Sequence, residues 1–107
     1  MTVVATVPEK TTAYLTVSFL DKAGAPAIPA SVTYRIDCLT TNTAILADTA
    51  LTPAASIEIT LTPAQNAIIN QANALEAKRV TVKATYGASD ALNDEYDYLV
   101  KNLSGVT

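Results

Sequence analysis

The sequence contains no histidine, the side chain most often used as a general base and as a metal ligand. With Cys38 as its only cysteine, it cannot build a structural zinc site or a Ser-His-Asp or Cys-His catalytic arrangement. Its 3 glycines are too few for a phosphate-binding Gly-rich loop. We therefore expect no enzyme activity, no catalytic residue, no cofactor and no metal.

A single cysteine also excludes an intrachain disulfide, whereas small secreted domains usually carry several. The segment Met1–Pro8 has no basic residue and only a short apolar run, which is not the pattern of a signal peptide. No stretch approaches the roughly 20 apolar residues of a membrane span. We expect a soluble protein that is made in a cytoplasm and held together by its core.

Charge is scarce, since 16% of the 107 residues are charged, against about 25% in a typical domain. The net charge is −3, and the 7 basic residues are scattered, with only Lys78 and Arg79 adjacent. This distribution argues against binding to nucleic acid or to an anionic membrane. Half of the residues are apolar, which excludes a disordered chain and favours a single domain that packs against other subunits.

Alternating apolar and polar residues predict strands over Tyr14–Leu20, Ser31–Leu39, Ser56–Leu61, Arg79–Tyr86 and Glu95–Leu103. A short edge strand over Ala44–Ala47 and an extra strand over Val3–Val7 complete the set. Leu99 falls on the outward face of its strand, out of pattern. The side chains expected in the core are Leu15, Val17, Phe19, Val32, Tyr34, Ile36, Cys38, Ile57, Ile59, Leu61, Val80, Val82, Ala84, Tyr86, Tyr96, Tyr98 and Val100.

One short helix is expected after Leu61. Thr62 is its N-cap, Pro63 stands at the first helical position, and Gln65 completes a capping box with Thr62. Residues 48–54 and 87–94 are expected to be loops.

Together these elements predict an all-β fold, an immunoglobulin-like antiparallel β-sandwich of about seven strands with one short helix between the fifth and sixth strands. Residues 1–12 form an N-terminal arm or first edge strand, and residues 13–107 form the sandwich domain. The alternative architecture is a small β-barrel. The Cys…Trp…Cys hallmark of antibody domains is missing, because the chain has no tryptophan.

Three features were weighed as sites. Cys38 could be a reactive thiol, but it continues an apolar face and is expected to be a small buried hydrophobe. The oxygen-rich stretch Asp90–Asp97 could hold calcium, but a solvated loop is the expectation. The tyrosines could stack on sugars, but only Tyr14 is expected to be exposed, as an anchor at an interface.

Five stretches of the chain resemble small virion proteins of tailed bacteriophages. In that family an Ig-like strand ends in an Asp-x-x-Gly-x-Pro turn, here Asp21 to Pro26, and leads to a Pro-x-Ser-x-x-Tyr-Arg-Ile strand, here Pro29 to Ile36. The stretches that carry the resemblance are Tyr14–Pro26, Pro29–Asp37, Ile57–Ile68, Arg79–Gly87 and Tyr96–Leu103.

The resemblance implies a non-enzymatic virion protein, made in the bacterial host cytoplasm, that binds capsid, connector or tail subunits as a decoration or as a neck or tail accessory. We expect a homo-oligomer or symmetric copies on the particle. The expected contact residues are Val3, Val4, Val7, Tyr14 and Leu99. The alternative function is a carbohydrate-binding Ig-like module for adhesion to the host surface.

Overall fold

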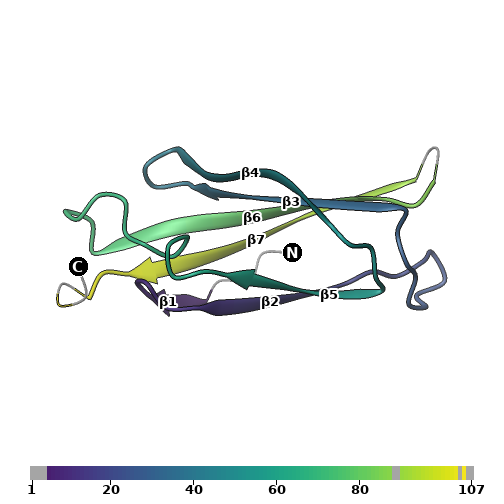
Figure 1. The fold of residues 1–107 in the computed structure, drawn as a ribbon, viewed down its shortest axis with the longest axis horizontal. Helices are drawn as coiled ribbons and strands as arrows, with labels where there is room; N and C mark the ends of the chain where they lie inside the picture. Colours follow the sequence, from purple (N-terminus) through teal and green to yellow (C-terminus); the bar gives the residue numbers. More distant parts are fainter. Residues whose placement is uncertain (1–4, 88–89, 104, 106–107) are drawn as a thin grey trace.

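The computed structural model describes residues 5–87, 90–103 and 105 (Figure 1). These residues form two β-sheets and no helix, so the expected all-β, β-sandwich-like fold is confirmed. The strands are β1 (Thr6–Pro8), β2 (Ala13–Ser18), β3 (Ser31–Cys38), β4 (Thr43–Leu51), β5 (Ser56–Leu61), β6 (Leu75–Thr85) and β7 (Ala91–Lys101).

The larger sheet has the order β1-β7-β6-β3-β4, and the smaller sheet pairs β2 with β5. Every pair is antiparallel except β1 with β7, which is parallel with Thr6 opposite Leu99. The expectation of a wholly antiparallel sandwich was therefore wrong at this one pair. A parallel pair needs a long connection between its strands, and here the other five strands provide it.

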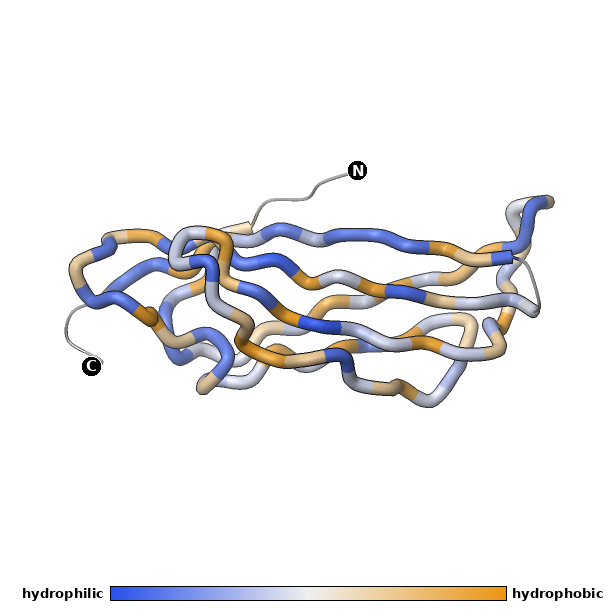
Figure 2. The backbone as a smooth tube through the Cα atoms, turned by 90° about the horizontal axis from the view of Figure 1, so that it is seen from above, coloured by the Kyte–Doolittle hydropathy of each residue, from blue (hydrophilic) through white to orange (hydrophobic). Residues whose placement is uncertain are grey.

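More buried and more exposed residues alternate along β2, β5 and β6. Hydrophobic and hydrophilic residues follow one another along the backbone tube (Figure 2). The core cluster draws on both sheets, with Phe19, Ile36, Val80, Val82 and Val100 all fully buried. Tyr34, Tyr86 and Tyr96 pack against this cluster, and Tyr98 belongs to it. The predicted inward faces are confirmed, and they hold the two sheets together by removing apolar surface from water.

Three strands are longer than expected. β4 continues through residues 48–51, which were predicted as loop, and β7 begins at Ala91 inside a second predicted loop. β6 begins at Leu75, so that the β6–β7 hairpin pairs Leu75 with Lys101 at one end and Thr85 with Ala91 at the other. The neighbouring strands supply the backbone partners, and that pairing overrides the weak strand preference of the polar residues.

The expected helix after Leu61 is wrong, although its capping box forms. The Gln65 amide N–H donates to Thr62 Oγ1 at 3.2 Å, and the Thr62 N–H donates to Gln65 Oε1 at 3.0 Å. One turn follows, closed by the Asn66 N–H on the Thr62 carbonyl at 3.0 Å. Three residues after Asn66, the N–H groups of Ile69 and Asn70 donate to the carboxylate of Glu76 instead of to helical carbonyls. Tertiary contacts therefore outcompete the local helix signal.

Of the N-terminal segment, the structure describes residues from Ala5 onward, and there β1 is an edge strand of the larger sheet. Val7 is half-buried and packs against the core. The buried Glu9 follows, and its Oε1 accepts the Leu103 N–H at 2.7 Å. This bond ties the segment after β1 to the segment after β7.

Candidate functional site

The most unusual group of side chains is a buried ion pair. Glu76 and Lys78 both lie on the inward face of β6, and both side chains are 0% exposed. Lys78 Nζ lies 3.6 Å from Glu76 Oε1 and donates a hydrogen bond to the Ala67 carbonyl at 2.9 Å. Charges removed from water are tolerated only when they are paired and hydrogen-bonded, so these two side chains depend on each other.

The Glu76 carboxylate organises the segment between β5 and β6. It accepts the N–H groups of Ile69 at 2.7 Å and of Asn70 at 2.9 Å, and the side-chain amide of Asn73 at 3.1 Å. Burial by itself raises the pKa of Glu76, but these hydrogen bonds and the charge of Lys78 outweigh it, so the pKa lies below its ordinary value. Glu76 is therefore a carboxylate at neutral pH.

A second buried contact lies beside the ion pair, because Tyr98 is the cross-strand partner of Lys78. The Tyr98 hydroxyl donates to Asn66 Oδ1 at 2.8 Å, and Asn66 Nδ2 donates to the Thr11 carbonyl at 2.7 Å. Burial raises the pKa of Tyr98, so the phenol stays protonated and remains a donor. This network joins β7, the segment before β2 and the turn after β5.

Cys38 completes the cluster. Its side chain is buried, at 1% exposure, and its Sγ lies 4.0 Å from Glu76 Oε1. The expectation that Cys38 is a small buried residue is confirmed. Glu76, Lys78 and Cys38 are all enclosed, and Glu76 and Lys78 hold the segment 67–70 against β6.

Replacing Tyr98 with phenylalanine is expected to lower the free energy of unfolding by about 1–3 kcal/mol, because Asn66 Oδ1 then loses a buried hydrogen-bond donor. Urea denaturation followed by circular dichroism measures the change. Tyr14→Phe is the control, since Tyr14 is 65% exposed and its hydroxyl stays hydrated. Equal losses in the two variants would show that the buried bond contributes nothing.

The buried carboxylate also makes stability depend on pH. A pKa lowered by folding gives a stabilisation that is present above the unfolded value, near 4.5, and is lost as the pH falls through the folded value. We therefore expect the wild type to have a larger free energy of unfolding than Glu76→Gln at pH 7, and this difference to shrink below pH about 4.5. Urea midpoints of both proteins from pH 7 to pH 3 measure the difference, and a pH-independent difference would contradict the assignment.

Ion pairs cross the outer face of the larger sheet. Arg79 reaches both Asp97, at 2.7 Å, and Glu95, at 2.9 Å, while Arg35 binds Asp37 at 2.8 Å. The hydrogen bond to the partner aspartate is the main cause that raises the pKa of each arginine. The positive charges on this face are matched by carboxylates, so it offers no basic patch to an anionic partner.

The oxygen-rich stretch 90–97 is strand from Ala91 onward, so the expected solvated loop is wrong over most of its length. Glu95 and Asp97 point outward to Arg79. Burial, together with the nearby Asp94, raises the pKa of Tyr96 to about 12. Among the described residues, no group of three or more Asp, Glu, Cys or His side chains is arranged to hold a metal ion.

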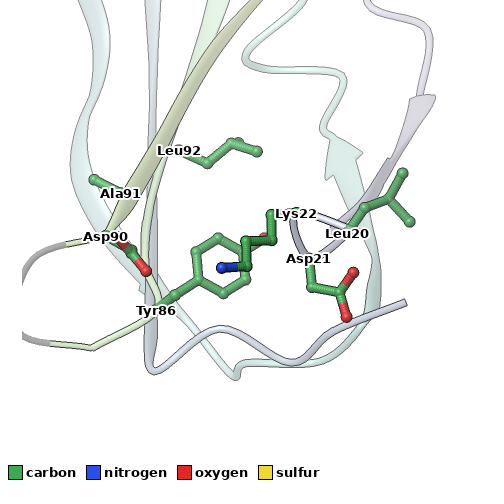
Figure 3. Close-up of a pocket in the computed structure, with 7 residues that line it drawn as sticks. All are labelled: Leu20, Asp21, Lys22, Tyr86, Asp90, Ala91 and Leu92. Carbon is green, nitrogen blue, oxygen red and sulfur yellow. The ribbon is translucent and has the colours of Figure 1, made fainter. Parts of the chain in front are cut away.

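An open pocket of about 680 Å³ lies at one end of the sandwich (Figure 3). The ring of Tyr86 lies between Asp90, the residue just before β7, and the turn that carries Leu20, Asp21 and Lys22. Its charged residues are exposed. Residues 88–89, between Gly87 and Asp90 in the sequence, lie outside the described residues.

A second hollow, of about 260 Å³, lies between β2 and the β1–β7 edge of the larger sheet. Its lining is mostly apolar, with Val7, Leu15, Val80 and Tyr98 among the side chains, and Asp97 as the acidic one. Tyr14 is 65% exposed, which confirms the prediction that it is the exposed tyrosine. It also lines this hollow.

The expected contact residues do not form one patch. Val7 and Tyr14 line the same hollow, whereas Leu99 is half-buried on the outer face of β7, opposite Thr6 of β1. Val3 and Val4 lie outside the described residues. Their role in binding stays a prediction.

Comparison with known proteins adds no relative: no protein-family model, no curated protein and no solved structure matches the chain. Across the described residues, no helix has the length and apolar character needed to cross a membrane.

The sequence analysis missed the buried polar residues Glu76, Lys78 and Asn66. A signal was present for two of them. Carrying the alternation of Val80, Val82 and Ala84 backwards along β6 by steps of two places Lys78 and then Glu76 on the inward face. Asn66 gave no such signal, because its burial depends on the turn after β5 folding back onto the segment before β2.

Proposed function

We propose that this chain is a non-enzymatic structural protein of a tailed-phage virion, an Ig-like domain that binds capsid, connector or tail subunits. The chain binds its neighbours through its surface, and several symmetric copies on one particle strengthen weak individual contacts by avidity. The strand order supports the Ig-like part of this proposal, and the turn after β2 supports the resemblance to phage virion proteins.

The strand order supports the Ig-like part of the proposal. Immunoglobulin-type sandwiches place the last, sixth and third strands side by side in one sheet and pair the second with the fifth in the other. Here β7-β6-β3 are neighbours in the larger sheet, and β2 pairs with β5 in the smaller one. β4 on the far edge and the short β1 beside β7 complete an Ig-like arrangement.

The turn after β2 supports the resemblance to phage virion proteins at the level of its chemistry. Asp21 Oδ1 accepts the N–H groups of Ala23 at 2.8 Å and of Ala25 at 3.0 Å. Gly24 has φ of 84°, a value that glycine adopts without strain. The Asp and Gly of the Asp-x-x-Gly-x-Pro motif therefore each have a structural reason.

The carbohydrate-binding alternative has less support. Sugar-stacking sites need exposed aromatic rings, and among the described large apolar residues Tyr14 is the exposed aromatic one. The remaining tyrosines pack against or within the core. A glycan array with and without calcium separates the two functions, because strong binding to a glycan would favour adhesion.

Quantitative mass spectrometry of purified particles tests the proposal. We expect peptides of this chain to co-purify with the major capsid and tail proteins through a density gradient, at a fixed ratio to a subunit of known copy number. A chain that stays in the soluble fraction of the lysate, with no peptides in the particle band, would overturn the proposal.

A further inference from the structure

The two sheets leave four strand edges that pair with no other described strand, on β1, β4, β2 and β5. Natural proteins protect such edges with charge, proline, irregular register or short length. β1 has three residues and ends at Pro8, β4 carries Asp48 and shifts register against β3, and β5 carries Glu58. β2, Ala13–Ser18, has none of these features.

The backbone of β2 presents hydrogen-bonding groups along its free edge. Residues of an antiparallel strand direct their N–H and C=O groups alternately to one side and the other. The Phe19 N–H donates to the Ala55 carbonyl at 2.8 Å, on the β5 side, so Val17 and Leu15 face that side as well. Tyr14, Thr16 and Ser18 therefore point their backbone groups away from β5.

The apolar hollow of about 260 Å³ runs beside this edge. β2 contributes the stretch 13–16 to its wall, and β1 and β7 contribute the opposite wall. Asp97 of β7 lies at this hollow, but its carboxylate points to the outer face of the sheet and binds Arg79 at 2.7 Å, so an occupant needs no positive charge there. An added strand needs backbone hydrogen-bonding groups along its edge and a surface that its side chains can cover. The free edge of β2 supplies the first, and the apolar hollow, called the trough below, supplies the second.

The unequal width of the sheets decides what fits. The larger sheet has five strands against two in the smaller, and residues of β1 and β7 line the hollow beside β2, where they form a ledge. A second copy that approached edge to edge would bring its own β1 and β7 into the space that this ledge fills. A single extended strand has no such ledge and can lie in the trough.

We propose that the free edge of β2 binds one extended segment of a partner protein, which adds a third strand to the smaller sheet. The segment is uncharged where it faces the trough and carries apolar side chains at alternate positions. Its backbone pairs with Tyr14, Thr16 and Ser18, and its apolar side chains cover Val7 and Leu15. This proposal gives the proposed structural function a binding mode, but strand addition itself requires no virion.

The probe is a peptide with blocked termini and the sequence of β5, Ser-Ile-Glu-Ile-Thr-Leu. This sequence already forms a strand against β2, on the edge of β2 opposite to the free one. Amide chemical shifts and hydrogen exchange are measured by NMR on the full chain, with up to about 1 mM peptide, a range that detects weak binding. We expect the amides of Tyr14, Thr16 and Ser18 to exchange rapidly without peptide and to shift and become protected with it.

Two proline variants, one on each outer edge of the smaller sheet, sharpen the test. Thr16→Pro removes a backbone N–H that faces the free edge of β2, and proline is tolerated there because the β2–β5 bonds remain. Thr60→Pro makes the equivalent change on the far edge of β5, opposite Tyr14. We expect the first to weaken peptide binding at least tenfold and the second to leave it within twofold.

Equal binding by the two variants would overturn the proposal, as would no response of the three amides to the peptide. Protection of Tyr14, Thr16 and Ser18 before peptide is added would also overturn it, because the edge would then be filled by the chain itself or by its copies. These readouts concern the β2 edge alone, so their failure is distinct from a failure to find the chain in particles.

Discussion

Replacing Glu76 with alanine is expected to lower the free energy of unfolding by about 3–5 kcal/mol, a large part of the stability of a small domain. The change leaves the buried Lys78 side chain without its carboxylate partner, and it removes the acceptor of the Ile69 and Asn70 N–H groups. Urea denaturation at pH 7, followed by circular dichroism, measures the loss.

The matched control is Glu58→Ala, which removes an exposed carboxylate from β5 and should change stability by no more than about 0.5 kcal/mol. A double-mutant cycle with Lys78→Met tests the coupling. The loss caused by Lys78→Met should be much smaller once Glu76 is alanine, because the ion pair is already broken. Additive losses, or a loss for Glu76→Ala below about 1 kcal/mol, would show that the pair does not hold this region.

Replacing Phe19 with alanine is expected to cost about 3–5 kcal/mol, because Phe19 is 0% exposed and fills the space between the two sheets just after β2. Leu20→Ala is the control. Leu20 is the next residue, points to the other side and is 49% exposed, so its truncation should have an effect within about 0.5 kcal/mol.

Thermal and urea unfolding of the two variants measure this difference. The contrast between neighbouring residues depends on the alternation along the chain. Comparable losses at Phe19 and Leu20 would mean that the alternation does not divide core from surface in this stretch.

The core could be predicted from sequence because its signal is local. The buried residues Val32, Ile36 and Cys38 on β3, and Val80 and Val82 on β6, lie an even number of residues apart along their strands and all face inward. A strand places side chains on alternate faces whatever its neighbours are, so the pattern survives without knowledge of the pairing.

The helix and the strand ends could not be predicted, because they depend on contacts distant in sequence. The capping box of Thr62 and Gln65 forms, yet the chain after it is held by Glu76 and Lys78. β4 extends past Ala47 because its backbone pairs with β3, which no local propensity records. The buried ion pair reversed the usual expectation that charged residues lie outside.

The candidate site was predicted in part. An exposed tyrosine follows from the alternation of β2, and Tyr14 is confirmed as one. The hollow beside it joins Val7 from β1 to Val80 from β6, residues that only the topology brings together. The unprotected edge of β2 likewise depends on which strand pairs with which, and that information is absent from the alternation.

Electron cryo-microscopy of purified, symmetry-averaged particles tests the proposed function most directly. We expect copies of a sandwich about 47 Å long and 22 Å wide at symmetry-related positions on the capsid, connector or tail, in contact with neighbouring subunits. Particles complete in every other subunit, with no density of this shape and no peptides of the chain, would contradict the proposal that it is a structural protein of the virion.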